Sequence, residues 1–90
     1  MEIRKPAQAG TMESGDVYVT VEPSTAEEPE ITLESLVLEQ YGHQILQTIR
    51  ETLEICRVTG VKMTVRDRGA LEYAIRSRVE TALLRAGEEE

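Results

Sequence analysis

Apolar and polar residues alternate along three stretches of the chain. The alternation is clearest in residues 16–22 and 61–66, where every second side chain is apolar and most of these are β-branched. It begins again at residues 31–34. A period of two is typical of a strand with one buried face. The pattern therefore predicts three strands.

Residues 7–13 are a weaker strand candidate because alanine and glycine have low strand propensity. Ser14 and Gly15 separate this stretch from residues 16–22, and a glycine at the second central position is typical of a tight turn. We expect a hairpin with a two-residue turn and Ser14 at its tip. This register places two pairs opposite each other: Met12 with Val17, and Glu13 with Asp16.

Two longer stretches repeat apolar residues with a helical period. The first, of about five turns, has one apolar side: Leu38, Tyr41, Ile45, Ile49, Leu53 and Cys56. The second has a similar stripe: Leu71, Ala74, Ile75, Val79, Ala82 and Ala86. Asp67 or Gly69 is a candidate N-cap for the second helix.

The predicted order is β-β-β-α-β-α. This is an α+β fold, in which a small, mostly antiparallel sheet has two amphipathic helices on one face. The strand, helix and strand between residues 31 and 66 are a candidate right-handed parallel crossover. We expect one domain over residues 1–90, with frayed ends at residues 1–5 and 87–90.

Composition narrows the function classes. The 90 residues have a net charge of −7 and contain one cysteine and one histidine, too few soft ligands for a structural zinc site. No apolar run exceeds three residues, so we expect a cytoplasmic chain without a signal peptide or membrane span. The acidic balance argues against a nucleic-acid partner, because such binding needs Lys and Arg at phosphates.

The charge is unevenly distributed. Residues 1–30 hold seven acidic and two basic side chains, whereas residues 57–87 hold seven basic and three acidic ones. A positively charged partner would be attracted to the N-terminal third.

Candidate catalytic groups are few. His43 falls on the polar side of the first helix, and Cys56 falls on its apolar side, which favours a surface histidine and a buried, inert thiol. Glycine-rich phosphate-binding patterns are absent from the sequence. The chain is therefore predicted to be non-catalytic.

Arg78 lies near the apolar stripe of the second helix, where a charge needs water or a partner. One interpretation is that its stem packs and its guanidinium reaches water. The other is that Arg78 and Arg85 form a cationic spot for an anionic ligand or a partner surface.

Ser14 has a setting suited to carrying a group. Its hydroxyl is expected at the apex of a hairpin, between acidic residues, in a domain without catalytic apparatus of its own. A serine hydroxyl in such a place is a potential modification site.

Motifs spread over nearly the whole chain reinforce this hypothesis: Ala9-Gly10-Thr11-Met12-Glu13-Ser14-Gly15-Asp16-Val17, Tyr41-Gly42 with Ile45, Val58-Thr59-Gly60-Val61, Asp67-Arg68-Gly69-Ala70-Leu71-Glu72 and Arg76-Ser77-Arg78-Val79-Glu80. Together they resemble the acyl carrier protein of citrate lyase, its γ subunit. Arg68 and Met12 depart mildly, since that family often has Lys and Leu there. The Asp-Ser-Leu signature and the helical-bundle fold of fatty-acid acyl carriers are not expected here.

The resemblance implies that Ser14 is esterified through a phosphodiester to 2'-(5''-phosphoribosyl)-3'-dephospho-CoA, whose thiol carries acetyl and then citryl groups. It also implies four partners: the citrate lyase α subunit, which exchanges acetyl for citryl; the β subunit, which releases oxaloacetate; the transferase that attaches the group; and an acetyl-loading ligase. Candidate recognition residues around the serine are Glu13, Gly15, Asp16 and Arg78.

Two alternatives remain open. The same kind of prosthetic group serves the acyl carriers of citramalate lyase and malonate decarboxylase, which the sequence separates poorly from citrate lyase. A second alternative is an interaction module whose acidic hairpin binds a basic partner while Ser14 stays unmodified. A small standalone enzyme is a more distant alternative.

Overall fold

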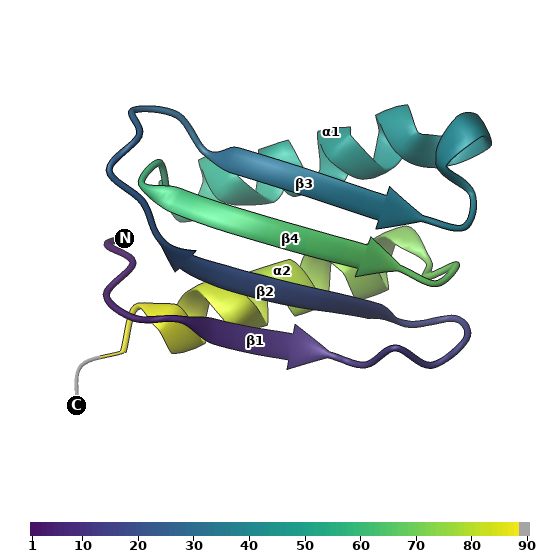
Figure 1. Cartoon of the computed structure of the whole chain (residues 1–90), viewed down its shortest axis with the longest axis horizontal. Helices are drawn as coiled ribbons and strands as arrows, with labels where there is room; N and C mark the ends of the chain where they lie inside the picture. The colour runs from purple at the N-terminus through teal and green to yellow at the C-terminus, as the bar shows by residue number, and fades with distance from the viewer. Residues whose placement is uncertain (89–90) are drawn as a thin grey trace.

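The computed structural model describes residues 1–88. Strands and helices follow each other in the predicted order (Figure 1): β1 Ala7–Gly10, β2 Val17–Pro23, β3 Glu30–Ser35, α1 Leu38–Cys56, β4 Val61–Asp67 and α2 Glu72–Ala86. Both helices cover the same face of one sheet, as expected. Within the described part of the chain, neither helix has the length and apolar character that a membrane span requires.

The sheet is mixed, with the strand order β1-β2-β4-β3. β2 pairs antiparallel with both β1 and β4, so the sheet is mostly antiparallel as predicted. β3 and β4 are parallel and are joined through α1. The strand–helix–strand stretch is therefore a parallel crossover.

The core lies between the sheet and the helices. Strands β2 and β4 bury alternate side chains: Val17, Val19, Val21, Val61, Met63 and Val65. The helices pack complementary apolar residues against them: Ile45, Ile49, Leu53, Ile75, Val79, Ala82, Leu83 and Ala86. Most of the predicted stripes are confirmed. Leu38, Tyr41 and Leu71 are instead largely exposed, because they lie near the starts of the helices.

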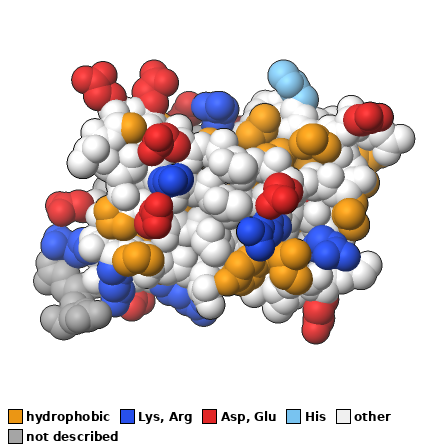
Figure 2. Space-filling model, viewed as in Figure 1, with side chains coloured by type: hydrophobic (Ala, Val, Ile, Leu, Met, Phe, Trp, Pro, Cys, Tyr) orange, Lys and Arg blue, Asp and Glu red, His pale blue; other side chains and the backbone are white. Residues whose placement is uncertain are grey.

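The other face of the sheet is uncovered and polar. Its acidic and basic side chains are interspersed, with uncharged surface between them (Figure 2). Two ion pairs bridge neighbouring strands here, Arg66 with Glu34 at 3.0 Å and Lys62 with Glu22 at 3.9 Å. Such exposed pairs contribute little to stability.

The predicted two-residue turn between the first strands is wrong. β1 ends at Gly10, which pairs with Tyr18, and the connection is residues 11–16. Gly10 has a φ of +92°, and a side chain there would collide with the Val17 carbonyl oxygen. The chain leaves the ladder at this point, so two predicted cross-strand pairs do not form: Met12 with Val17, and Glu13 with Asp16.

The N-terminal segment, for which the sequence predicts fraying, is bonded to the end of α2. Ile3 is buried in the core, and the amides of Arg4 and Lys5 donate to the Ala86 carbonyl oxygen at 2.8 and 3.2 Å. At the other end, the Gly87 amide donates to the Leu83 carbonyl oxygen at 3.0 Å. Residues 89–90, also expected to fray, lie outside the described residues.

Candidate functional site

Three connections meet at one end of the sheet (Figure 1). They are the loop of residues 11–16, the short link from β3 into α1, and residues 68–71 between β4 and α2. Ser14 lies in the first of them and is exposed. Within residues 1–88, its hydroxyl group forms no hydrogen bond. The hydroxyl therefore faces solvent, as predicted from the sequence.

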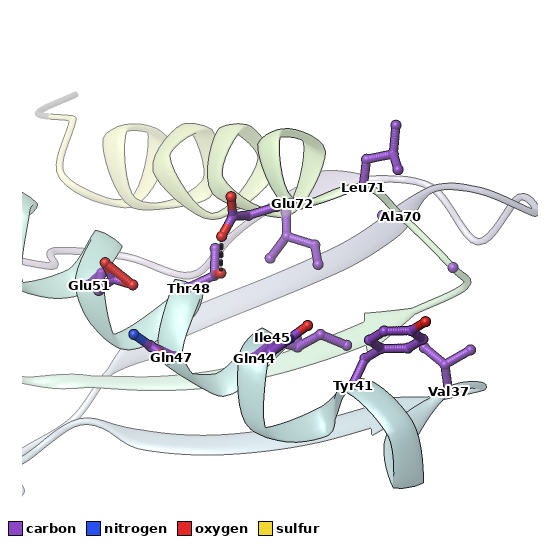
Figure 3. Close-up of a pocket in the computed structure, with 12 residues that line it drawn as sticks. Val37, Tyr41, Gln44, Ile45, Gln47, Thr48, Glu51, Ala70, Leu71 and Glu72 are labelled. Carbon is purple, nitrogen blue, oxygen red and sulfur yellow. Dashed lines mark hydrogen bonds between the residues drawn. The ribbon is translucent and has the colours of Figure 1, made fainter.

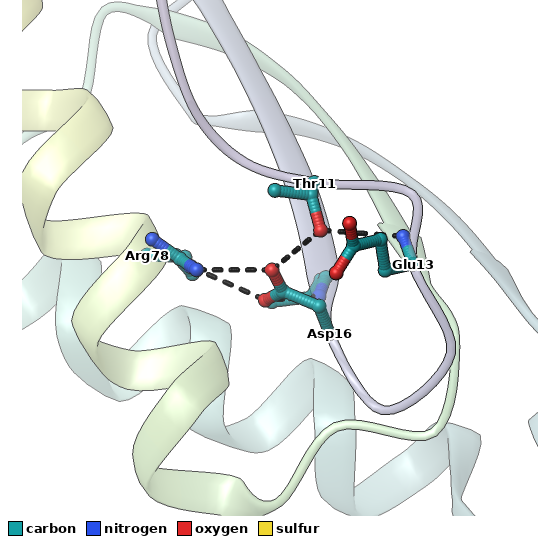
Figure 4. A network of polar contacts seen from close by, with 5 residues as sticks. Thr11, Glu13, Asp16 and Arg78 are labelled. Carbon is teal, nitrogen blue, oxygen red and sulfur yellow. Dashed lines mark hydrogen bonds and ion pairs between the residues drawn. The ribbon is translucent and has the colours of Figure 1, made fainter.

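The loop around Ser14 is closed by its own hydrogen bonds (Figure 4). The Thr11 hydroxyl donates to Asp16 Oδ2 at 2.7 Å and accepts from the Glu13 amide at 3.2 Å. The Asp16 amide donates to the Glu13 carbonyl oxygen at 3.0 Å. Gly15 has a φ of +84°, a conformation that other residues rarely adopt. Ser14 thus lies on a loop whose backbone is fixed on both sides.

Asp16 joins this loop to α2. Arg78 donates to both carboxylate oxygens of Asp16, from Nε at 3.2 Å and from Nη2 at 2.9 Å (Figure 4). The Arg78 hydrogen bonds, followed by the Thr11 hydroxyl and the Val17 amide, lower the pKa of Asp16 to about 2. The pair is ionised at neutral pH and holds the loop against the helix.

Arg78 and Arg85, the two arginines of the predicted cationic spot, have different partners. Arg85 Nη1 donates to the Gln8 carbonyl oxygen at 2.8 Å, on the edge strand β1. The structure brings Arg78, but not Arg85, to Asp16 in the Ser14 loop.

Arg68 also lies at the end of the sheet that holds the Ser14 loop. The sequence alone did not indicate a function for it. Its carbonyl oxygen accepts the Gly15 amide at 2.7 Å, and its amide donates to the Asp16 carbonyl oxygen at 2.9 Å. Its Nε atom is buried without a hydrogen-bond partner. Among the described residues, no carboxylate pairs with its guanidinium. Arg68 is thus a cation beside the loop, without an ion pair to any acidic side chain that the structure describes.

Asp67 supports the neighbouring connection from within. It is only 2% exposed, and its carboxylate accepts the Ser35 hydroxyl at 2.8 Å and the Ala70 amide at 2.9 Å. These bonds tie β3, β4 and the start of α2 together. The prediction that Asp67 or Gly69 is the N-cap of α2 is wrong. Leu71 occupies that position and has no side-chain cap.

A groove of about 730 Å³ lies between residues 37–51, which include most of α1, and residues 69–75 at the start of α2 (Figure 3). Val37 and Tyr41 lie at one end, near the β4–α2 connection, and Glu51 lies at the other. The Thr48 hydroxyl crosses the groove to Glu72 Oε1 at 3.2 Å. The volume of the groove falls within the range of small-molecule binding sites.

Other candidate groups lie apart from Ser14. His43 is exposed on α1, and Cys56 is partly buried at the end of the same helix. Burial, followed by the charge of Glu80, raises the pKa of the Cys56 thiol, which favours an unreactive cysteine. In the described part of the chain, no three His, Cys, Asp or Glu side chains gather as a metal site would require.

Comparison with known proteins defines the class. A family model described as "ACP: Malonate decarboxylase delta subunit (MdcD)" matches residues 4–86. A citrate lyase acyl carrier protein of Clostridium perfringens is 48% identical over 88 residues, covering 98% of this chain and 87% of the relative. One of Vibrio cholerae is 43% identical over 86 residues, covering 96% and 88%.

The chain therefore belongs to a family of acyl carrier proteins, the one that includes the citrate lyase acyl carrier proteins. This confirms the resemblance seen in the sequence motifs. A crystal structure of a Pseudomonas malonate decarboxylase hetero-tetramer in complex with malonate contains a chain of the same fold. That chain is 21% identical, with a TM-score of 0.84 over 94% of this chain and 87% of its own length.

Proposed function

We propose that this chain is the acyl carrier subunit of a cytoplasmic citrate lyase complex. Ser14 Oγ carries 2'-(5''-phosphoribosyl)-3'-dephospho-CoA through a phosphodiester. When bound, this arm supplies the thiol on which acetyl and citryl groups are held as thioesters. The protein's own task is to present the arm to its partners while they carry out the chemistry.

One observation carries the proposal: an exposed serine hydroxyl, without a hydrogen bond to any described residue, lies on a loop whose backbone is fixed. Asp16 and Thr11 hold that loop from one side, and the Arg68 backbone holds it from the other. A fixed loop presents Ser14 in one geometry to the enzyme that attaches the arm. It also leaves the hydroxyl available for esterification.

The residues beside Ser14 fit the charge of such an arm. A phosphodiester is anionic, and arginine is well suited to bind it with paired donors. Arg78 already donates to Asp16, whereas the Arg68 Nε atom has no acceptor among residues 1–88. Gly15, next to the serine, has open space where a side chain would lie. We assign phosphate binding to Arg68 and positioning of the loop to Arg78.

The proposed partners are the α and β subunits of citrate lyase, the prosthetic-group transferase and the acetyl-loading ligase. Attachment keeps the thioester at a high effective concentration near both catalytic subunits without free diffusion. Glu13 and Asp16 are proposed to help the transferase recognise the loop by charge.

Intact mass spectrometry of the protein purified from its native host tests this function. We expect an added mass equal to the arm, and peptide fragmentation should locate it on Ser14. Ser14→Ala should fold normally and lack the added mass, while Ser24→Ala and Ser77→Ala should retain it. A native preparation with no added mass at Ser14 overturns the carrier function and favours an unmodified interaction module.

A second candidate is the carrier of malonate decarboxylase, supported by the matched family model and the likeness in fold to a chain of that enzyme. The acyl group on the arm separates the two. Citryl and acetyl species indicate citrate lyase, malonyl and acetyl species indicate the decarboxylase, and citramalyl species indicate citramalate lyase.

A further inference from the structure

The groove between α1 and α2 opens at the same end of the molecule as the Ser14 loop. Gly69, Ala70 and Leu71 line it, and they directly follow Arg68, whose carbonyl oxygen accepts the Gly15 amide. Three residues of chain span at most about 11 Å. A long flexible group attached to Ser14 therefore begins within a short distance of the groove.

The lining of the groove is selective. Its apolar contributors are Val37, Tyr41, Ile45, Ala70, Leu71 and Ile75. Between them lie side chains able to hydrogen-bond an amide, namely Gln44, Gln47 and Thr48. The ionisable carboxylates of the lining belong to Glu51 and Glu72, and no lysine or arginine is among the lining residues. This chemistry favours a neutral chain with amide groups and repels phosphates.

The exposure of two apolar lining residues also favours an occupant of the groove. Leu71 is 63% exposed and Tyr41 is 49% exposed, although both belong to the apolar stripes of their helices. An occupant of the groove would cover apolar surface that the fold itself leaves open to water. Glu72 accepts the Thr48 hydroxyl across the groove and lies 4.0 Å from Arg76 Nη2.

We propose that the α1–α2 groove receives the neutral, amide-containing segment of the Ser14 arm and its thioester while the carrier is between partners. The inference rests on the proposed attachment at Ser14. It places the Ser14 phosphodiester beside Arg68 and the uncharged segment, which follows the diphosphate of the arm, in the groove. A thioester in the groove is partly shielded from water and from other thiols until a catalytic subunit draws it out.

Nuclear magnetic resonance on the loaded and unloaded chain tests this placement. Intact mass first establishes that Ser14 is loaded, so that failure of attachment is separated from failure of the groove. We expect loading to shift the side-chain amides of Gln44 and Gln47 and the backbone amides of Thr48 and Ala70. Shifts confined to residues 13–16 and 68 in a fully loaded chain overturn the inference, as do groove shifts that appear only when a catalytic subunit is added.

A matched pair of variants gives a second readout. Gln44→Trp fills the groove, while Gln40→Trp places the same side chain at an exposed α1 position outside the lining. In loaded protein, Gln44→Trp should speed the reaction of the arm thiol with a disulfide reagent several-fold, and Gln40→Trp should not. Tyr41→Ser, which removes an apolar wall, should act like Gln44→Trp. Equal thiol reactivity in all loaded and folded variants also overturns the inference.

Discussion

The carboxylate of Asp16 and the guanidinium of Arg78 lie 62 residues apart in the sequence and form two hydrogen bonds, at 3.2 and 2.9 Å. This contact joins the acidic N-terminal part of the chain to its basic C-terminal helix. It also fixes the loop that contains Ser14. The aliphatic part of the Arg78 side chain lies so close to Gly10 that a side chain at position 10 would contact it.

Removing the Arg78 side chain should loosen the Ser14 loop more than it destabilises the fold. Arg78 is 41% exposed, so solvent screens the pair and Arg78→Ala should cost about 1 kcal/mol of unfolding free energy. The Asp16 amide should exchange with solvent faster, and attachment of the arm should slow. Hydrogen exchange and urea unfolding measure the two effects. The control is Arg76→Ala, on the same helix, and equal exchange in both variants contradicts this role.

The same pair predicts a pH dependence. The pKa of Asp16 is lowered from 3.8 to about 2 in the folded chain, chiefly by Arg78. The ionised carboxylate therefore stabilises the fold fully above the ordinary value, and this stabilisation is lost as the pH falls through about 2. Across that window the native chain should lose stability more steeply than Asp16→Asn. If the unfolding free energy of the native chain and that of Asp16→Asn fall by the same amount over this pH range, the pair contributes nothing.

Gly10 should tolerate no side chain. Gly10→Ala combines an unfavourable positive φ, worth about 1–2 kcal/mol, with a collision against the Val17 carbonyl oxygen. We expect a total loss of about 3 kcal/mol or more, seen as a lower denaturation midpoint. Gly69→Ala is the matched control, because its φ is +87° but the space around it is open. If both substitutions cost the same, the collision is unimportant.

Arg68 should bind a phosphate placed on Ser14, whatever group that phosphate joins. Phosphoserine can be incorporated at position 14, and its phosphate has a second pKa near 6. A nearby guanidinium favours the dianion, so phosphorus resonance should show a lower pKa in the native chain than in Arg68→Gln. Arg66→Gln, which removes a cation already paired with Glu34, should leave the pKa unchanged. Identical values in all three proteins would exclude contact between Arg68 and the phosphate.

Most of the architecture was predictable because strong patterns match it. Alternation in β2 and β4 and the helical stripe through Ile45, Ile49 and Leu53 correspond to buried faces. The loop length was not predictable, because it depends on where Gly10 must leave the ladder. That point is set by the approach of the Val17 carbonyl oxygen, which local propensity does not describe.

The site was predictable in part. The exposed position of Ser14 follows from the motif and its setting, whereas the contact of its loop with the Arg68 backbone depends on long-range pairing between the β1–β2 loop and the residue directly after β4. A basic residue directly after a strand was the available signal, but it is too common to be specific. The groove was not predictable, because Leu71 and Tyr41 match the apolar stripes of a core and are exposed only in the folded structure.

The N-terminus and the end of α2 lie at the end of the sheet opposite the Ser14 loop (Figure 1). The N-terminal amino group donates to the Arg57 carbonyl oxygen at 3.1 Å, and residues 4 and 5 are bonded to Ala86. A fluorescent label, an affinity handle or a surface linkage attached at this end of the molecule would lie far from Ser14. The molecule can thus be immobilised in one orientation, with the Ser14 loop facing the enzymes whose binding is to be measured.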